Sequence, residues 1–116
     1  MHNYLFYREP NEGNLEYKLN LSNFTSNKYE KYSTQLKYRV LEGRGEAIYI
    51  IGVFDNGEIK GIPIKEFNIT IDKFNHICMN VNCSIKLIMK CRYNQKKFLI
   101  LKAVANFDLN SLPFIF

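Results

Sequence analysis

Carboxylates are the side chains of this sequence with the clearest capacity for chemistry, and those of its first half include Glu9, Glu12, Glu16, Glu42, Glu46 and Asp55. A fold that gathers such groups can hold a divalent metal ion that activates water. The alternative is that they are solvated charges on strands and turns. His2 and His76 have no serine or cysteine placed beside them, and no His or Cys pair has metal-ligand spacing. Zinc catalysis and an activated nucleophile are therefore not expected.

Basic residues form a second group. Sixteen Lys and Arg outnumber eleven Asp and Glu, and no acidic residue occurs between Asp72 and Asp108. Strand alternation predicts that Lys86, Lys90 and Arg92 share one face beside a polar turn. Such a surface attracts phosphates, and an aromatic ring beside it can stack on a base. The candidate nucleic-acid contacts are Lys86, Lys90, Arg92, Tyr93, Lys96, Lys97 and Lys102, unless this is an ordinary solvated hairpin.

The hydrophobic pattern predicts the elements that position these residues. After an arm at 1–14, the alternation of 15–21 predicts a strand, and apolar residues at helical spacing predict a helix over 27–41. The run 46–54 predicts a buried strand, and Asp55-Asn56-Gly57 predicts a hairpin turn into a return strand at 58–62. Gly43 and Gly45 are expected to be turn residues, with a positive φ at Gly43 that ends the helix.

The second half predicts a helix over 64–79, then strands near 85–92 and 98–105. The order β-α-β-β-α-β-β predicts an α+β fold, a two-layer sandwich with a mostly antiparallel sheet of about five strands and two helices on one face. We expect one domain at 15–105 and a tail at 106–116. The three cysteines form no CxxC pair, and the sequence shows no signal peptide or membrane span. A cytoplasmic location follows as an expectation.

Two segments resemble the Schlafen/AlbA-type domain. They are Glu-Tyr-Lys at 16–18, with Glu12 before it, and Tyr-Ile-Ile-Gly-Val-Phe-Asp-Asn-Gly at 49–57. Some members of that family cut RNA with a metal ion held by carboxylates, which would implicate Glu12, Glu16 and Asp55. This sequence departs from the pattern in the spacing of the first carboxylate and in Phe54, which replaces an acidic residue.

Four blocks resemble the GTP-binding protein one and two family of elongation factor Tu-like GTPases. Glu-Gly-Asn-Leu-Glu-Tyr-Lys-Leu at 12–19 is similar to that family's E-G-N-I-E-Y-K-L. Thr-Gln-Leu-Lys-Tyr-Arg at 34–39 is similar to its T-Q-M-K-W-R, and Glu-Gly-Arg-Gly-Glu-Ala-Ile-Tyr at 42–49 to its E-G-R-G-E-A-V-Y. Ile-Gly-Val at 51–53, with Asp-Asn-Gly at 55–57, resembles I-G-V-E-D-N-G. The blocks keep the family's order and spacing.

The resemblance implies the region just before the GTPase domain of such a protein. There the family continues into the phosphate loop G-N-V-D-x-G-K-S-T-L, but residues 105–112 here read Ala-Asn-Phe-Asp-Leu-Asn-Ser-Leu, without the glycines or the lysine. No cofactor is therefore expected in this chain; GTP and Mg²⁺ would belong to the family's GTPase domain. Expected partners are that domain and RNA or the ribosome, with no membrane. The tail at 106–116 would be a cut or diverged junction.

Overall fold

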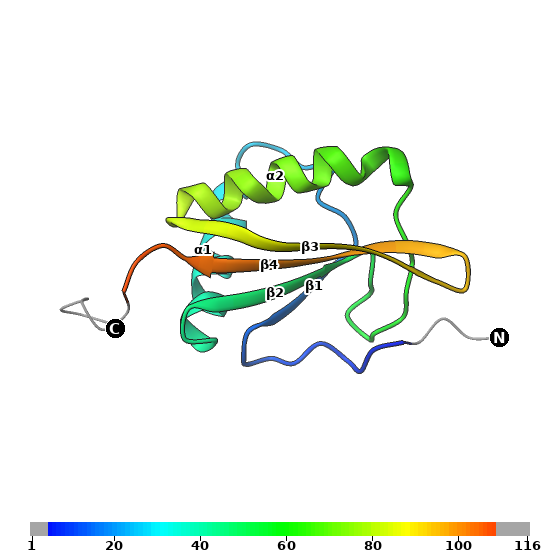
Figure 1. Cartoon of the computed structure of the whole chain (residues 1–116), viewed down its shortest axis with the longest axis horizontal. Coiled ribbons are helices and arrows are strands. Elements are labelled where there is room, and N and C mark those ends of the chain that lie inside the picture. Colours follow the sequence, from blue (N-terminus) through cyan, green and yellow to red (C-terminus); the bar gives the residue numbers. More distant parts are fainter. Residues whose placement is uncertain (1–4, 109–116) are drawn as a thin grey trace.

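Residues 5–108, the part of the chain that the computed structural model describes, form four strands and two helices (Figure 1). The strands are β1 (Leu15–Lys18), β2 (Glu46–Ile51), β3 (Cys83–Tyr93) and β4 (Lys96–Ala105). Helix α1 (Lys28–Glu42) joins β1 to β2, and a 3-10 turn (Ile64–Glu66) leads into α2 (Phe67–Asn80). Within this part of the chain no helix has the length and apolar character needed to cross a membrane. His2 and most of the predicted tail lie outside the described residues.

The strands form one sheet in the order β1-β2-β4-β3, with β1 and β2 parallel and the other neighbouring strands antiparallel. Both helices cover the same face, because the larger core cluster joins residues of α1 and α2 to alternate residues of β2 and β4. The predicted α+β class with a mostly antiparallel sheet and two helices on one face is confirmed. The helix predicted over 27–41 matches α1 within one residue.

The predicted return strand at 58–62 does not form, so the expectation of about five strands is wrong. Only one bridge, between Val53 and Ile59, remains of the expected hairpin. The backbone turns away from the direction of the strands at Gly52 and again at Gly61, whose φ angles are 105° and 83°. The N–H groups of Lys60 and Gly61 both donate to the carbonyl of Gly52 at 2.9 Å. These bonds close a tight loop and replace the ladder that a strand pair would need.

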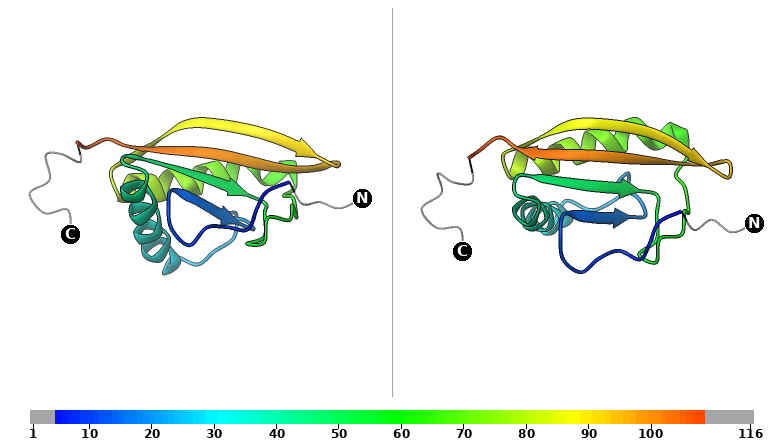
Figure 2. Two further views of the ribbon diagram at one scale, coloured as in Figure 1. Left: turned by 90° about the horizontal axis from the view of Figure 1, so that it is seen from below. Right: turned by 60° about the horizontal axis from the view of Figure 1, so that its bottom comes forward.

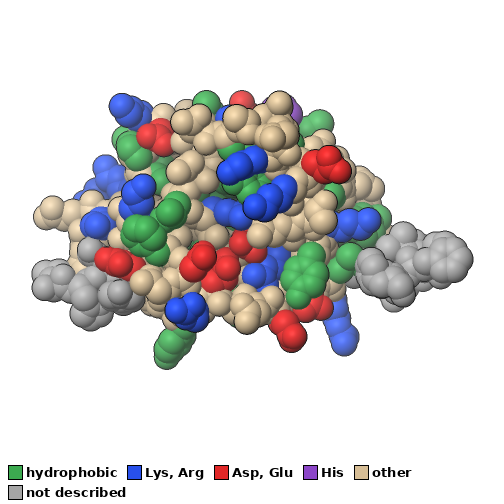
Figure 3. Space-filling view, turned by 180° about the vertical axis from the view of Figure 1, so that it is seen from behind, with side chains coloured by type: hydrophobic (Ala, Val, Ile, Leu, Met, Phe, Trp, Pro, Cys, Tyr) green, Lys and Arg blue, Asp and Glu red, His purple; other side chains and the backbone are tan. Residues whose placement is uncertain are grey.

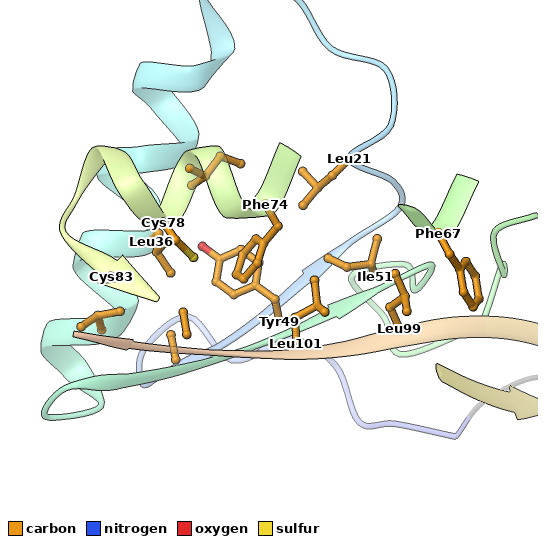
Figure 4. Packing of buried hydrophobic residues seen from close by; sticks show 14 of the residues in the cluster. Leu21, Leu36, Tyr49, Ile51, Phe67, Phe74, Cys78, Cys83, Leu99 and Leu101 are labelled. Atoms are coloured by element: carbon orange, nitrogen blue, oxygen red, sulfur yellow. The ribbon is translucent and has the colours of Figure 1, made fainter. Parts of the chain in front are cut away.

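The main core lies between the helices and the sheet. Tyr49 of β2 packs on Phe74 of α2 with ring centroids 4.9 Å apart, and Figure 4 shows both rings between the helices and the strands. Leu36 and Val40 of α1 are fully buried in the same cluster. Burying each large apolar side chain contributes about 1.5–3 kcal/mol. The helical spacing of these residues therefore determines which faces of α1 and α2 turn toward the sheet.

A smaller core covers one end of the opposite face. Tyr17, Ile50 and Phe98 point to this side because side chains alternate along their strands. Phe6 of the arm packs on them, with ring centroids 6.1 Å from Tyr17 and 5.7 Å from Phe98. Figure 2 shows the arm running past β1 at one margin of the sheet, opposite β3. Phe6 thus packs the arm onto this face of the sheet.

Gly43 ends α1 but does not have the predicted positive φ; its φ is −90°. The left-handed residues are Arg44, at 55°, and Gly45, at 110°. Gly43 is required for a different reason. A Cβ atom there would overlap the carbonyl oxygen of Glu46 and lie 2.6 Å from the Cβ of Asn14. Close approach of two chain segments, rather than backbone handedness, makes this position a glycine.

Candidate functional site

A polar pocket of about 440 Å³ lies along the outer edge of β1. Its walls come from the arm, β1 and the loop after it, α1, and the turn at Asp55. The lining residues are Glu9, Glu16, Tyr17, Lys18, Leu19, Asn20, Asn23, Phe24, Lys28, Tyr32, Gln35 and Asp55. The pocket thus brings carboxylates and lysines together. Figure 3 shows the same mixture on the back of the molecule, where acidic and basic side chains lie next to each other.

Glu16 and Arg39 form a buried ion pair on the wall of this pocket. The Nε of Arg39 donates to Oε1 of Glu16 at 2.9 Å, and both side chains are about 5% exposed or less. The other two guanidinium nitrogens donate to the carbonyls of Gly13 at 2.9 Å and Pro10 at 3.0 Å. One arginine therefore ties α1 to β1 and to the arm. The alternative interpretation of the sequence, in which Glu16 is a solvated charge on a strand, is therefore wrong for this residue.

Lys18 lies beside this pair. Its Nζ is 3.6 Å from Oε2 of Glu16 and 4.6 Å from the centroid of the Tyr32 ring. Burial lowers the pKa of Lys18, and the negative charges of Glu16 and Glu9 oppose that shift. Each carboxylate oxygen of Glu16 thus has a cation beside it: Arg39 at Oε1 and Lys18 at Oε2.

Glu9 is one of the carboxylates of the first half, but no sequence pattern indicated a role for it in the candidate metal site, and the structure places it in the pocket. Its Oε2 accepts a hydrogen bond from the backbone N–H of Tyr17 at 2.5 Å, and its own N–H donates to the carbonyl of Asp55 at 2.7 Å. Burial is the main reason why the pKa of Glu9 is raised to about 7; the Tyr17 N–H opposes the shift, and Glu16 and Asp55 add to it. Nothing in the local sequence signals this, because the partners come from other segments.

Glu9→Gln is expected to remove a pH dependence of stability. Between pH 4.5, the ordinary pKa of Glu9, and about 7 the folded protein holds more protons than the unfolded chain, so stability falls as pH rises. After discounting for the solvent-exposed part of the side chain, we expect the wild type to lose about 1 kcal/mol across this window. Urea unfolding at several pH values measures it. Gln can still accept from Tyr17, so the variant should show a flatter profile, whereas exposed Glu12→Gln should follow the wild type.

The carboxylates of the nuclease alternative are not assembled as that hypothesis requires. Glu16 and Asp55 line the pocket, whereas Glu12 is exposed and is not among the lining residues. In the described part of the chain, no three His, Cys, Asp or Glu side chains come close enough together to hold a metal ion. Glu16 is also occupied by Arg39 and Lys18. The geometry does not favour a metal-dependent RNase.

The basic residues of the nucleic-acid hypothesis are spread over both faces of the β3–β4 hairpin. Lys90 lies opposite Leu99, and Arg92 lies opposite Lys97. Both pairs are on the same face of the sheet as the helices, beyond the part that the helices cover. Lys102 and Lys96 lie opposite Leu87 and Tyr93 on the other face, and Lys102 is 3.3 Å from Glu46. A bulge between Ile85 and Leu87 takes up Lys86 and interrupts the alternation. The expected face shared by Lys86, Lys90 and Arg92 is therefore broken, although all three side chains are exposed.

The blocks that resemble a GTPase family converge on the joints between the arm, α1 and β2. Besides the Arg39 contacts, the N–H of Gly13 donates to Oε1 of Glu42 at 3.3 Å, and the Asn14 amide donates to the Glu46 carbonyl at 3.2 Å. At the tip of the next loop, the Gly57 N–H donates to the Phe54 carbonyl at 2.9 Å and closes the Asp55-Asn56-Gly57 turn. These residues build the fold.

Comparisons with known proteins give a distant similarity to part of GTP-binding protein 2. The chain is 39% identical to the human and mouse proteins over 80 residues, which are 69% of this chain and 13% of each relative. It is 33% identical over 93 residues to the uncharacterized protein R625 of Acanthamoeba polyphaga mimivirus, covering 79% of this chain and 50% of that protein. No protein-family model matches the chain. The chain thus spans a small part of the first two relatives and half of the third.

Proposed function

We propose that this chain is a non-catalytic accessory domain, equivalent to the region before the GTPase domain in a protein like GTP-binding protein 2. It docks such a protein on a polyanionic partner, either RNA and the ribosome or an acidic protein. The observation that carries the proposal is that the residues resembling the GTPase family are used in structural contacts. Glu16, Arg39 and Gly13 hold one another in place. Outside these contacts, Lys86, Lys90 and Arg92 of the hairpin are exposed.

The β3–β4 hairpin supports the docking role. It belongs to the stretch without acidic residues between Asp72 and Asp108. Lys86, Lys90 and Arg92 are exposed on it, and three consecutive apolar residues, Leu87, Ile88 and Met89, are between 42% and 45% exposed. An exposed apolar group surrounded by charges of one sign is typical of a contact surface for another macromolecule.

Reversing the charges of Lys86, Lys90 and Arg92 to Glu is the experiment that tests this function. The wild type is expected to bind single-stranded RNA, used as a polyanion, with an affinity that falls steeply with salt because neutralised phosphates release counterions. The triple variant should lose this binding and keep its fold. The matched control is Lys28→Glu/Lys31→Glu/Lys37→Glu, on exposed positions of α1. Equal losses in both variants would show that net charge alone is responsible and would contradict the proposed surface.

The chain is expected neither to bind nor to hydrolyse GTP. Phosphate loops hold GTP through glycine-rich backbone amides and a lysine, and residues 105–112 supply neither the glycines nor the lysine. Positions 109–112 lie outside the described residues. Calorimetric titration with GTP and Mg²⁺ measures the affinity. A dissociation constant in the micromolar range would contradict this part of the proposal.

A further inference from the structure

The two edge strands of the sheet, β1 and β3, differ in how other segments of the chain cover them. β1 has only four residues, and the arm closes its outer side: Tyr17 donates its N–H to Glu9 and its hydroxyl to the carbonyl of Tyr7 at 2.7 Å. β3 has eleven residues and, within 5–108, pairs with β4 alone. Figure 2 shows β3 at the margin of the sheet, at the opposite side from β1. A terminal strand turns alternate N–H and C=O groups outward, where a further strand can bind them.

The side chains on the middle of β3 are apolar on both faces of the sheet. Leu87 and Met89 lie opposite Lys102 and Ile100 on one face, and Ile88 lies opposite Leu101 on the other. Their exposed fractions are 42%, 45% and 45%. A strand added at this edge would place its own side chains beside these three residues and remove apolar surface from water. RNA has no row of backbone amides to pair with the outward C=O groups.

The charges on β3 indicate the charge that a segment bound at this edge must carry. Lys86, Lys90 and Arg92 are its charged residues, and the whole hairpin lacks an acidic side chain. Two copies of β3 paired with each other would bring like charges together, which disfavours a homodimer through this edge. A segment with acidic residues between apolar ones would instead meet the lysines and the arginine with opposite charges.

We propose that the outer edge of β3 binds an extended segment of a partner protein in which acidic and apolar residues alternate, added as a further strand of the sheet. The acidic side chains pair with Lys90 and Arg92 on one face of the sheet, and the apolar ones cover Leu87 and Met89 on the other face. This inference rests on the proposed docking function and names the chemistry of the partner.

A short blocked peptide of alternating Glu and Val tests the proposal with the full chain. Titration followed by NMR is expected to show saturable binding, with slower hydrogen exchange at every second amide of β3. Lys90→Glu/Arg92→Glu should weaken peptide binding about tenfold or more, because both charge pairs become repulsive, whereas Lys31→Glu/Lys37→Glu at exposed positions of α1 should change it little. The same peptide with all of its backbone amides N-methylated should not bind, because it lacks the donors for the ladder.

The alternative outcomes are distinct. Equal binding of the N-methylated peptide, or of a peptide with the same residues in Glu and Val blocks, would overturn strand addition. Binding of single-stranded RNA but not of the alternating peptide would overturn this inference and leave the proposed function intact. A concentration-dependent dimer that competes with the peptide would assign the edge to a second copy and overturn the choice of partner. Binding of neither polyanion would overturn both proposals.

Discussion

Arg39→Ala is expected to lower the free energy of unfolding by about 3–5 kcal/mol, because it leaves the buried carboxylate of Glu16 without its closest partner. The same substitution removes the donors to the carbonyls of Gly13 and Pro10, which hold the arm against α1. Lys18, 3.6 Å from Glu16, cannot replace a guanidinium that bonds in three directions. Urea unfolding at neutral pH, followed by circular dichroism, measures the loss.

Two further variants separate the ion pair from general effects of the mutation. Lys37→Ala removes an exposed cation from the same helix and should change stability by no more than about 0.5 kcal/mol. Glu16→Leu/Arg39→Met removes both charges and should recover part of the loss, because the buried carboxylate goes together with its partner; Lys18, 16% exposed, then loses one counter-charge, which keeps the recovery partial. If Arg39→Ala unfolds at the same urea concentration as Lys37→Ala, the Arg39 contacts do not hold the arm and α1 together in solution.

Gly43→Val is expected to cost about 2–3 kcal/mol, because the new side chain has no space where α1 meets β2. Its Cβ would overlap the carbonyl oxygen of Glu46 and lie 2.6 Å and 2.8 Å from Cβ and Nδ2 of Asn14. One of these contacts is backbone, so a change of rotamer cannot relieve it. Thermal unfolding should show a clearly lower midpoint.

Gly45→Ala serves as the comparison for Gly43. Its φ of 110° is unfavourable for alanine, but a Cβ there has no atom within 4 Å. The loss should therefore be only about 1–2 kcal/mol, from backbone strain alone. A loss at Gly45 larger than that at Gly43→Val would show that backbone handedness, rather than space, governs this turn.

Residue spacing along the chain was enough to predict most of the secondary structure. Tyr29, Tyr32, Leu36 and Val40 recur at helical spacing and place α1 within one residue. The apolar run at 98–105 predicts the strand β4, and the structure shows that its Leu99, Leu101 and Ala103 enter the main core. These are local properties, because a helix or strand buries the side that its own apolar residues mark. The prediction of a return strand was wrong because an Asn-Gly pair indicates a turn only. It does not indicate the hydrogen bonds from Lys60 and Gly61 to Gly52, which close the loop instead.

The sequence by itself determined the fold class, the basic character of the β3–β4 hairpin and the similarity to part of a GTP-binding protein, since each follows from residue types and their order. Only the tertiary structure decided what the individual site residues do. Glu16 meets Arg39 from 23 positions away, and Glu9 meets Asp55 across 46, so the burial of both carboxylates and the raised pKa of Glu9 depend on how distant segments pack. The bulge that takes up Lys86 and the open edge of β3 likewise depend on the register with β4. Periodicity specifies which side of an element is buried, but the three-dimensional arrangement specifies which groups from other elements lie there.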